Sequence, residues 1–307
     1  MKKTQQKISI ESTLKSMDTE EFIDIYFYRP IGYRWALLFR KLNISPNTVT
    51  IAAIIIGIGA GVCFGFSSLK INFLGMLLLI WANSYDSADG QLARMTGKTS
   101  SIGRMLDGLC GIVWFLVIYT AICVRLTPSW GIWIWALGVI TGYFHTKQTS
   151  MADYYRNIHL FFLKGKSGSE LSDYATVKAH YMNMSWKHHF TDKLFTFFYI
   201  NYTKDQESMT PNFQQMITII RKKYPEEVPE GFRSAFRKKS LPLMKYTNML
   251  SFNTRIIAFF ISLWINLPWL SFIFELTVLN AMLIYMIIRH ERICAAFSKQ
   301  FIAEEYD

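Results

Sequence analysis

Three aspartates with the spacing of a cation site lie in residues 81–113, a stretch that is otherwise largely apolar. Asp86 and Asp89 are three residues apart, so a helix places them on one face, one turn from each other. Asp107 opens a second apolar helix after the polar turn at residues 96–101, and a short loop between antiparallel helices brings their facing ends together. Clustered carboxylates repel one another unless a cation neutralises them, and oxygen ligands suit Mg²⁺, Mn²⁺ or Ca²⁺. The pattern therefore predicts a divalent metal site.

The alternative interpretation of this stretch is a solvated loop at a helix end. Asp89 and Arg94 would then be ordinary surface charges. Two observations favour a site instead. Charged side chains at membrane depth are costly, so they are functional candidates by default. The small residues Gly90, Ala93 and Gly103 also keep side chains out of the way of a ligand.

The same residues resemble the signature of the CDP-alcohol phosphotransferase family of integral membrane enzymes, D-x2-D-G-x2-A-R-x8-G-x3-D-x3-D. Every spacing is kept at the matching positions, which are Asp86, Asp89, Gly90, Ala93, Arg94, Gly103 and Asp107. So many fixed positions across two helices make the match specific. The last position departs from the family, because Gly111 stands where the family has its fourth aspartate.

The resemblance implies an enzyme that moves a phosphoalcohol group from a CDP-alcohol to a hydroxyl acceptor, such as a lipid or polyol, and releases CMP. It implies that Asp86, Asp89 and Asp107 hold Mg²⁺ or Mn²⁺ against the pyrophosphate. The implied substrate-binding residues are Gly90, Ala93, Arg94, Gly103 and Asn47. Asn47 belongs to residues 45–50, which resemble the start of the family's first membrane helix, and helix capping is its alternative role. The resemblance also implies a homodimer.

Gly111 leaves the reaction without the aspartate that is thought to be the family's general base. Three explanations stay open: another residue is the base, the acceptor needs none, or the chain no longer does chemistry. His145 is the candidate base, because the fourth predicted helix returns there to the face of the carboxylates and imidazole titrates near neutrality. Its alternative is an interfacial histidine with a backbone partner. The candidate catalytic residues are therefore His145 and Asp107.

Three further polar residues have weaker claims. Asp153 follows His145 by one to two turns and could equally be solvated. Asn83 lies one turn before Asp86 and could be a neutral metal ligand, although such residues more often bond between helices. Glu275 lies in the outer half of the last predicted helix, on the wrong side for this chemistry. It is interpreted as a buried hydrogen-bonding carboxyl or a lipid contact.

The composition indicates a membrane protein. Of 307 residues, 51% are hydrophobic, yet the formal net charge is +11. This combination fits a positive cytoplasmic face better than a nucleic-acid binder, because the bases are spread among apolar runs without a recognised nucleic-acid motif. The four cysteines occur singly, without the spacing of metal ligands, and are interpreted as reduced packing residues.

Six apolar segments predict an all-α protein with six transmembrane helices, at residues 49–66, 71–94, 102–126, 130–146, 255–267 and 269–288. The segment between the fourth and fifth is too polar to span and is expected to form short helices that continue the fourth. The predicted parts are a cytoplasmic N-terminus with an interfacial helix, four membrane helices, a cytoplasmic insert, two membrane helices and a tail: residues 1–45, 46–148, 149–251, 252–290 and 291–307.

Local signals predict how the first helices begin and pack. Ser45 and Pro46 suit the N-cap and first turn of the first membrane helix. Residues 18–43 mix aromatic and basic side chains, interrupted at Pro30, and predict an interfacial amphipathic helix, with a packed soluble helix as the alternative. Small residues let membrane helices approach closely, and the first membrane helix carries them at Gly57, Gly59, Gly61 and Gly65.

The positive-inside rule predicts the orientation. Of 33 Lys and Arg, only Lys70 and Arg125 fall in loops that would lie outside. Both termini, the turn between the carboxylates and the 149–251 insert are therefore expected on the cytoplasmic side, in the inner membrane if the source is bacterial. The polar start of the sequence has no apolar core, so no cleavable signal peptide is predicted.

Two classes of function follow from these observations. The first is a cytoplasm-facing transferase that makes a phospholipid, sphingolipid or related phosphodiester. The second is a non-catalytic membrane protein that binds CDP-linked ligands or partners, and Gly111 is its best support. A transporter is a distant third, because the sequence has no paired broken helices or inverted repeat.

Overall fold

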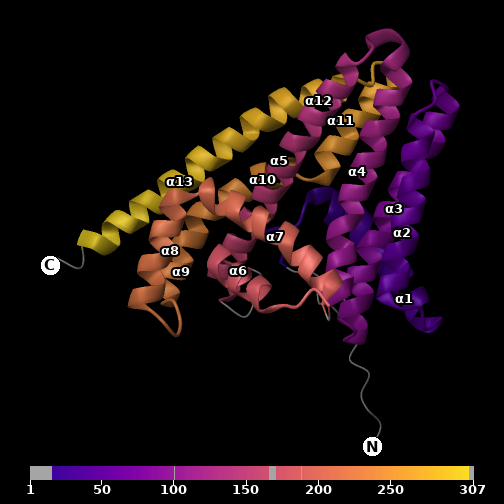
Figure 1. Ribbon diagram of the computed structural model, residues 1–307. Helices are drawn as coiled ribbons and strands as arrows, with labels where there is room; N and C mark the ends of the chain where they lie inside the picture. The colour runs from indigo at the N-terminus through magenta and orange to yellow at the C-terminus, as the bar shows by residue number, and fades with distance from the viewer. Residues whose placement is uncertain (1–15, 100, 166–170, 188, 304–307) are drawn as a thin grey trace, which may run out of the picture. The chain divides into compact units, whose positions relative to one another are not determined.

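In the computed structural model the chain folds into helices, and there is no strand in the part that the structure describes, residues 16–99, 101–165, 171–187 and 189–303. This confirms the predicted all-α class. The helices form two compact units (Figure 1). The first unit comprises Met1–Tyr143 and Phe252–Leu276, and the second comprises Phe144–Ser251 and Thr277–Asp307.

The first unit contains all the residues that match the family signature. Its elements are the π-helical segment η2 (Asp24–Tyr28), α1 (Arg29–Lys41), α2 (Pro46–Phe64), α3 (Leu69–Thr96), α4 (Ser101–Trp130), the start of α5 (Trp133–Lys164), α11 (Phe252–Trp264) and α12 (Leu270–Phe274). Helix α2 packs against α3 and α4, and α1 packs against α3. The predicted helices at these places agree with α2, α3, α4 and α11 to within about one turn at each end.

The second unit holds the rest of α5, the helices of the insert and the last helix of the chain. These are α6 (Tyr174–Asn183), α7 (Phe190–Ser208), α8 (Pro211–Lys223), α9 (Glu230–Ser240), η4 (Leu241–Leu243), α10 (Met244–Met249) and, after the π-helical segment η5 (Glu275–Leu279), α13 (Asn280–Ala303). Helix α5 runs past residue 146 to Lys164 without a break, as expected of an insert that continues the fourth predicted helix. Helix α13 packs on α8, α9 and α10.

The start of α2 has the predicted cap. Oγ of Ser45 accepts a hydrogen bond from the backbone N–H of Thr48 at 3.2 Å. Pro46 occupies the first turn, where its missing N–H costs no intrahelical bond. Asn47 is therefore not the capping residue.

The predicted interruption at Pro30 is wrong. The chain is helical from η2 directly into α1, and Pro30 lies in the first turn of α1. The backbone N–H of Arg29 donates to the carbonyl of Asp24, five residues earlier, which is the spacing of a π-turn. The hydrogen-bond pattern therefore changes from π to α just before Pro30, and the N–H that this proline lacks falls at that change. One face of α1, with Ala36 and Phe39, packs in a cluster with residues of α3. An interfacial role for its other face stays a prediction.

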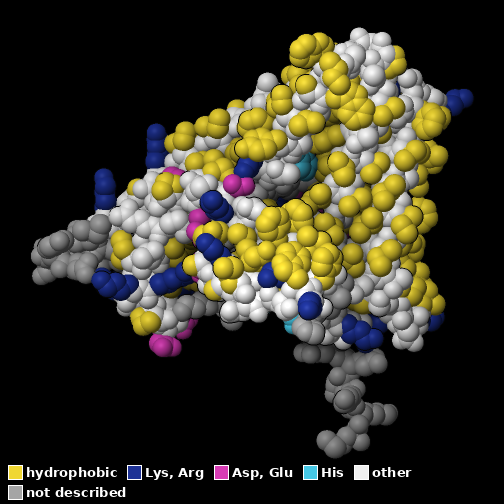
Figure 2. Space-filling model, viewed as in Figure 1, with side chains coloured by type: hydrophobic (Ala, Val, Ile, Leu, Met, Phe, Trp, Pro, Cys, Tyr) yellow, Lys and Arg dark blue, Asp and Glu magenta, His cyan; other side chains and the backbone are white. Residues whose placement is uncertain are grey.

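Among the described residues, three helical segments are long and apolar enough to cross a membrane: Pro46–Phe64, Leu106–Trp130 and Leu270–Gln300. Helix α11 has 13 residues, and α3 mixes Asn72, Asn83 and Asp86 into its apolar run. Yet large apolar side chains of α3 are exposed, as at Phe73, and Figure 2 shows hydrophobic side chains gathered over the first unit. These features support a membrane protein, and the six-span arrangement stays a prediction.

Close packing of α2 against α4 depends on two of the glycines that predicted it. A Cβ on Gly57 would lie 2.0 Å from Nε1 of Trp114, and one on Gly61 would lie 2.7 Å from Cγ1 of Val117. The same indole donates to the carbonyl of Ala53 at 3.2 Å. Gly59 does not have this role, because a Cβ there would meet no atom within 4 Å.

Glu275 is a buried, hydrogen-bonded carboxyl, the first of its two predicted interpretations. Its side chain pairs with Arg255 of α11 and accepts a hydrogen bond from the hydroxyl of Tyr119 at 2.6 Å. All three residues belong to the first unit. The ion pair therefore ties α11 to the end of α12 within an apolar surrounding.

The packing of Trp114 on Gly57 gives a testable prediction. Gly57→Ala should destabilise the protein by about 1–3 kcal/mol, because overpacking forces α2 and α4 apart or moves the indole out of its place. Thermal unfolding in detergent measures the effect. Gly59→Ala is the matched control on the same helix, and it should leave the midpoint unchanged or slightly raised. Equal midpoints for the two variants would contradict this account of the α2–α4 contact.

Candidate metal and nucleotide site

The structure brings the three predicted carboxylates together. Asp86 and Asp89 lie on α3, Asp107 lies in the second turn of α4, and one oxygen from each lies within 4.8 Å of the other two. We call these three residues the carboxylate cluster. Asp89 is 4% exposed, Asp86 is half-buried and Asp107 is exposed. The carboxylate cluster therefore runs from the interior of the first unit to its surface.

The end of α3 sets this arrangement. Gly97 follows the last residue of α3 with a φ of 66°, a left-handed conformation that glycine adopts without steric cost. The chain reverses after this residue, and α4 begins at Ser101. The second turn of α4 thereby returns to the side of α3, which places Asp107 beside the other two aspartates.

Hydrogen bonds orient two members of the carboxylate cluster. The hydroxyl of Thr50, on α2, donates to Oδ2 of Asp89 at 2.5 Å. Cys110, on α4, is hydrogen-bonded to Asp86. Oδ1 of Asp86 is buried and has no hydrogen-bond partner within the described ranges. Because buried polar atoms are normally paired, this oxygen and its two carboxylate neighbours fit a hard divalent cation.

Two arginines offset part of the negative charge. The guanidinium of Arg94 lies against Gly90, since a Cβ on that glycine would be 3.4 Å from Nη2, and its charge acts on the carboxylate cluster. Arg29 also acts on the cluster, but it is bonded to Glu20 at 3.0 Å. Arg94 is exposed at the rim, where it can reach a phosphate group.

Residues 43–158 match the family model described as CDP-alcohol phosphatidyltransferase. These residues are therefore similar to a CDP-alcohol phosphatidyltransferase domain. The match contains the whole carboxylate cluster, together with Gly111 and His145. At the level of the family it supports a membrane transferase of phospholipid synthesis, of a kind that generally depends on a divalent metal. No curated protein matches the chain.

The matched residues 43–158 also include the other residues that are implied to bind substrate. Ala93 is half-buried on α3, Gly103 lies in the first turn of α4, and Asn47 lies in the first turn of α2. The first turn of α4 is the part of that helix whose backbone N–H groups and dipole can meet a phosphate. The roles of these three residues stay predictions.

The candidate base lies in the second unit. The side chain of His145, on α5, is buried, and its role in proton transfer stays a prediction. Asp153 is exposed and accepts a hydrogen bond from the hydroxyl of Tyr202 at 3.3 Å, which suits a surface residue. Asn83 is hydrogen-bonded to Tyr28 of η2, so it makes the contact between helices that was the more common interpretation.

The position of the missing aspartate has room for a side chain. Gly111 lies on α4, one turn after Asp107, and a Cβ there would meet no atom within 4 Å. The same holds for Gly108, which is turned further from Asp107 around the helix. Packing therefore does not require glycine at position 111.

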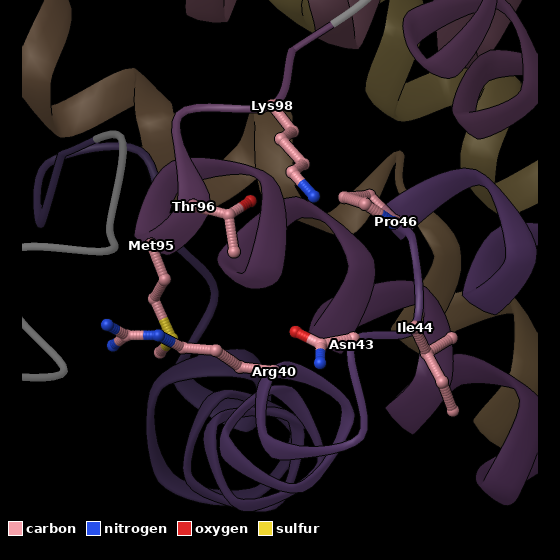
Figure 3. Close-up of a pocket in the computed structure, with 7 residues that line it drawn as sticks. All are labelled: Arg40, Asn43, Ile44, Pro46, Met95, Thr96 and Lys98. Carbon is pink, nitrogen blue, oxygen red and sulfur yellow. The ribbon is translucent and has the colours of Figure 1, made fainter.

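A pocket of about 340 Å³ lies beside the end of α3. Its lining residues come from α1, the start of α2 and the end of α3, and are Arg40, Asn43, Ile44, Pro46, Met95, Thr96 and Lys98. In Figure 3, Lys98 and Asn43 extend into the space between these elements. The two cations give the pocket an affinity for anionic groups. None of the predicted substrate-binding residues lines it.

Sequence reasoning missed the partners of the carboxylate cluster. Thr50 is 39 residues from Asp89 in the chain, and only the packing of α2 on α3 brings them together. The sequence did hold one signal, because the hydroxyl of Thr50 lies one turn into an otherwise apolar helix and needs a polar partner there. Cys110 could have been found from its place on the same helix as Asp107, one turn further on. Arg29 gave no signal that separates it from the other bases of its segment.

Metal binding by the carboxylate cluster predicts graded losses on substitution. Asp89→Asn should weaken metal-dependent binding of CDP by about 100-fold or more, because it removes the negative charge and replaces one carboxylate oxygen by an amide nitrogen that cannot bind the cation. Thr50→Val should weaken it by about 10-fold, since it removes only the partner that orients that ligand. The measurement is CDP affinity in detergent with and without Mg²⁺.

Asp153→Asn is the control for this series, because it makes the same change at an exposed aspartate of the second unit. It should leave the affinity as it is in the wild type. Equal CDP affinity with and without metal in the wild-type protein would contradict the assignment of the cluster.

Proposed function

We propose that this chain moves a phosphoalcohol or phosphatidyl group from a CDP-alcohol to the hydroxyl of a lipid or polyol acceptor and releases CMP. The observation that carries the proposal is the convergence of three carboxylate oxygens, within 4.8 Å of one another, inside the matched domain. Their donor chemistry suits Mg²⁺ or Mn²⁺.

Each member of the carboxylate cluster has a role in this proposal. Asp86, Asp89 and Asp107 hold the divalent cation, and Thr50 keeps Asp89 in place for it. When bound, the cation offsets the negative charge that develops on the phosphate oxygens of the leaving CMP. Arg94 donates hydrogen bonds to a phosphate of the nucleotide from the exposed rim.

The anionic parts of the substrates have two places in the first unit. The first turn of α4, which contains Gly103, is the positive end of the helix dipole and attracts a phosphate. The pocket lined by Arg40 and Lys98 lies beyond the end of α3 and offers two cations. We assign the nucleotide to the side of Arg94 and a charged acceptor or donor headgroup to this pocket.

The acceptor hydroxyl loses a proton in this reaction, and Gly111 has no side chain to take it. His145 is the proposed base, since a neutral imidazole accepts a proton near pH 7. Asp107 is the exposed member of the carboxylate cluster and the second candidate.

A second function is a membrane protein that binds CDP-linked ligands without reacting them. Gly111 is the observation that favours it. Retention of the complete carboxylate cluster and of Arg94 favours the enzyme, because a chain that had lost its chemistry would have little reason to keep charged groups in a costly environment. Release of CMP from CDP-diacylglycerol or CDP-ethanolamine, with candidate acceptors, distinguishes the two.

The proposed orientation has six spans, with both termini, the carboxylate cluster and the 149–251 insert on the cytoplasmic side. Within the first unit, Arg125 donates to Asn266 at 2.8 Å and to the carbonyl of Phe64 at 3.4 Å. The end of α2, the end of α4 and the loop after α11 therefore meet at one side, as three outer loops would. This contact supports the alternating direction of these helices, and the choice of the cytoplasmic side rests on the distribution of Lys and Arg.

The empty space at Gly111 gives a direct test of the missing base. Gly111→Asp restores the family signature and should raise the rate of CMP release by about 100-fold, the typical contribution of a general base, if proton transfer limits the wild type. Gly108→Asp adds the same carboxylate where it is turned away from Asp107, and it should bring no gain. An added carboxylate that takes up a proton beside its neighbours would also bring none.

His145→Ala completes this test. If His145 is the base, the substitution should abolish CMP release, and Gly111→Asp should partly restore it in the double variant. Activity unchanged by either substitution would refute both the missing-base account and the role of His145. CDP binding without CMP release in every variant would favour the binding protein.

A homodimer is part of the proposal on family grounds. Cross-linking in native membranes should give a species of twice the mass of the chain at low cross-linker concentration. A yield of monomer alone, under conditions that cross-link a known membrane dimer, would contradict it.

A further inference from the structure

A second group of ligating side chains lies in the second unit, away from every residue of the proposed reaction. His290, Glu291 and Cys294 are all buried on α13, and one ligand atom from each lies within 4.8 Å of the other two. His290 and Cys294 are four residues apart, so they project from one face of the helix. Two ligands at this spacing on a helix form one side of many zinc sites.

The distance between the two side chains fits a shared ion. Nδ1 of His290 lies 3.6 Å from Sγ of Cys294. A tetrahedral zinc ion, with Zn–N of about 2.0 Å and Zn–S of about 2.3 Å, separates such ligand atoms by about 3.5 Å. The two ligand atoms are thus already spaced for one ion.

Glu291 is held in place by the helix that packs on α13. Its oxygens accept hydrogen bonds from the backbone N–H groups of Asn212 at 2.6 Å and Phe213 at 3.2 Å, in the first turn of α8. A carboxylate oxygen has two lone pairs, so each retains one for a further partner. Outer contacts of this kind orient a metal-binding carboxylate.

A fourth polar group at this place has no partner. Tyr155, on α5, is completely buried, and its hydroxyl makes no hydrogen bond within the described chain. Its ring centroid lies 4.5 Å from that of His290. A buried hydroxyl without a partner costs about 1–3 kcal/mol, so a partner at this cluster is expected.

We infer that His290, Glu291 and Cys294 bind a zinc ion, with the hydroxyl of Tyr155 as the fourth group at the site. A ligand set with one nitrogen, one sulfur and oxygen donors favours zinc, whereas magnesium and calcium favour oxygen donors alone. The aromatic rings of Phe213 and Phe236 pack beside the site, each 6.0 Å from the His290 ring. The ion is structural and ties α13 to α5 and, through Glu291, to α8.

The test uses the full chain purified in detergent, dialysed against a weak chelator and analysed for metal content. The wild type should retain one zinc ion per chain. His290→Ala and Cys294→Ser should lose it, and Tyr155→Phe should weaken zinc binding by about 10-fold. Cys63→Ser is the matched control, because it removes a thiol of the first unit, and Asp89→Asn controls for the carboxylate cluster. Both should keep the zinc.

Cobalt substitution tests the ligand set on the wild-type protein itself, so it does not depend on whether the ligand variants fold. Wild-type protein loaded with Co²⁺ should show the thiolate charge-transfer band and the d–d bands of tetrahedral cobalt, and Tyr155→Phe should shift the latter. Wild type without zinc and without the thiolate band would overturn the inference, since a bridging water then satisfies Tyr155. If Cys294→Ser and His290→Ala retained as much zinc as the wild type, this result would also overturn the inference.

Discussion

Burying a carboxylate among apolar helices costs free energy unless a positive charge neutralises it, and this constraint divides the buried carboxylates of the first unit into two kinds. Glu275 and Asp89 are equally buried, at 3% and 4% exposed. Glu275 is neutralised by Arg255 within the protein, and breaking such a pair costs about 3–5 kcal/mol. Asp89 instead faces two more aspartates, and the positive charges near it lie toward the surface. Glu275 therefore has its countercharge within the protein, whereas the cluster around Asp89 requires a cation or a proton supplied from outside. This difference separates a structural ion pair from a functional site.

The elements that position this site are the ones that local sequence signals determine. The helical period alone places Asp86 and Asp89 on one face, and a short turn that begins at Gly97 is enough to return Asp107 to them. Ser45 caps α2 as predicted, because a capping interaction involves only residues a few positions apart. These signals do not depend on the rest of the fold, which is why they could be read from the sequence.

Contacts between distant segments were not accessible in this way. Thr50 orients Asp89 across 39 residues, and nothing in its own neighbourhood indicates that partner. Cys294 is free and completely buried, in agreement with its interpretation as a reduced packing residue, and only the fold shows that His290, Glu291 and Tyr155 gather beside it. The π-turn before Pro30 was also not predicted. A proline usually ends a helix, but here a local change of hydrogen bonding lets the helix continue through it.

The second unit shows why such a chain would benefit from a metal. Several of its helices are short, with 13 residues in α8, 11 in α9 and 6 in α10. Isolated helices below about 12–15 residues are marginal in water, so their stability comes from the long helices on which they pack. A zinc ion between α13 and α5 would fix that support at the level of α8, where Glu291 already caps the first turn. The ion would act on folding and leave the oxygen-rich carboxylate cluster to a different, harder cation.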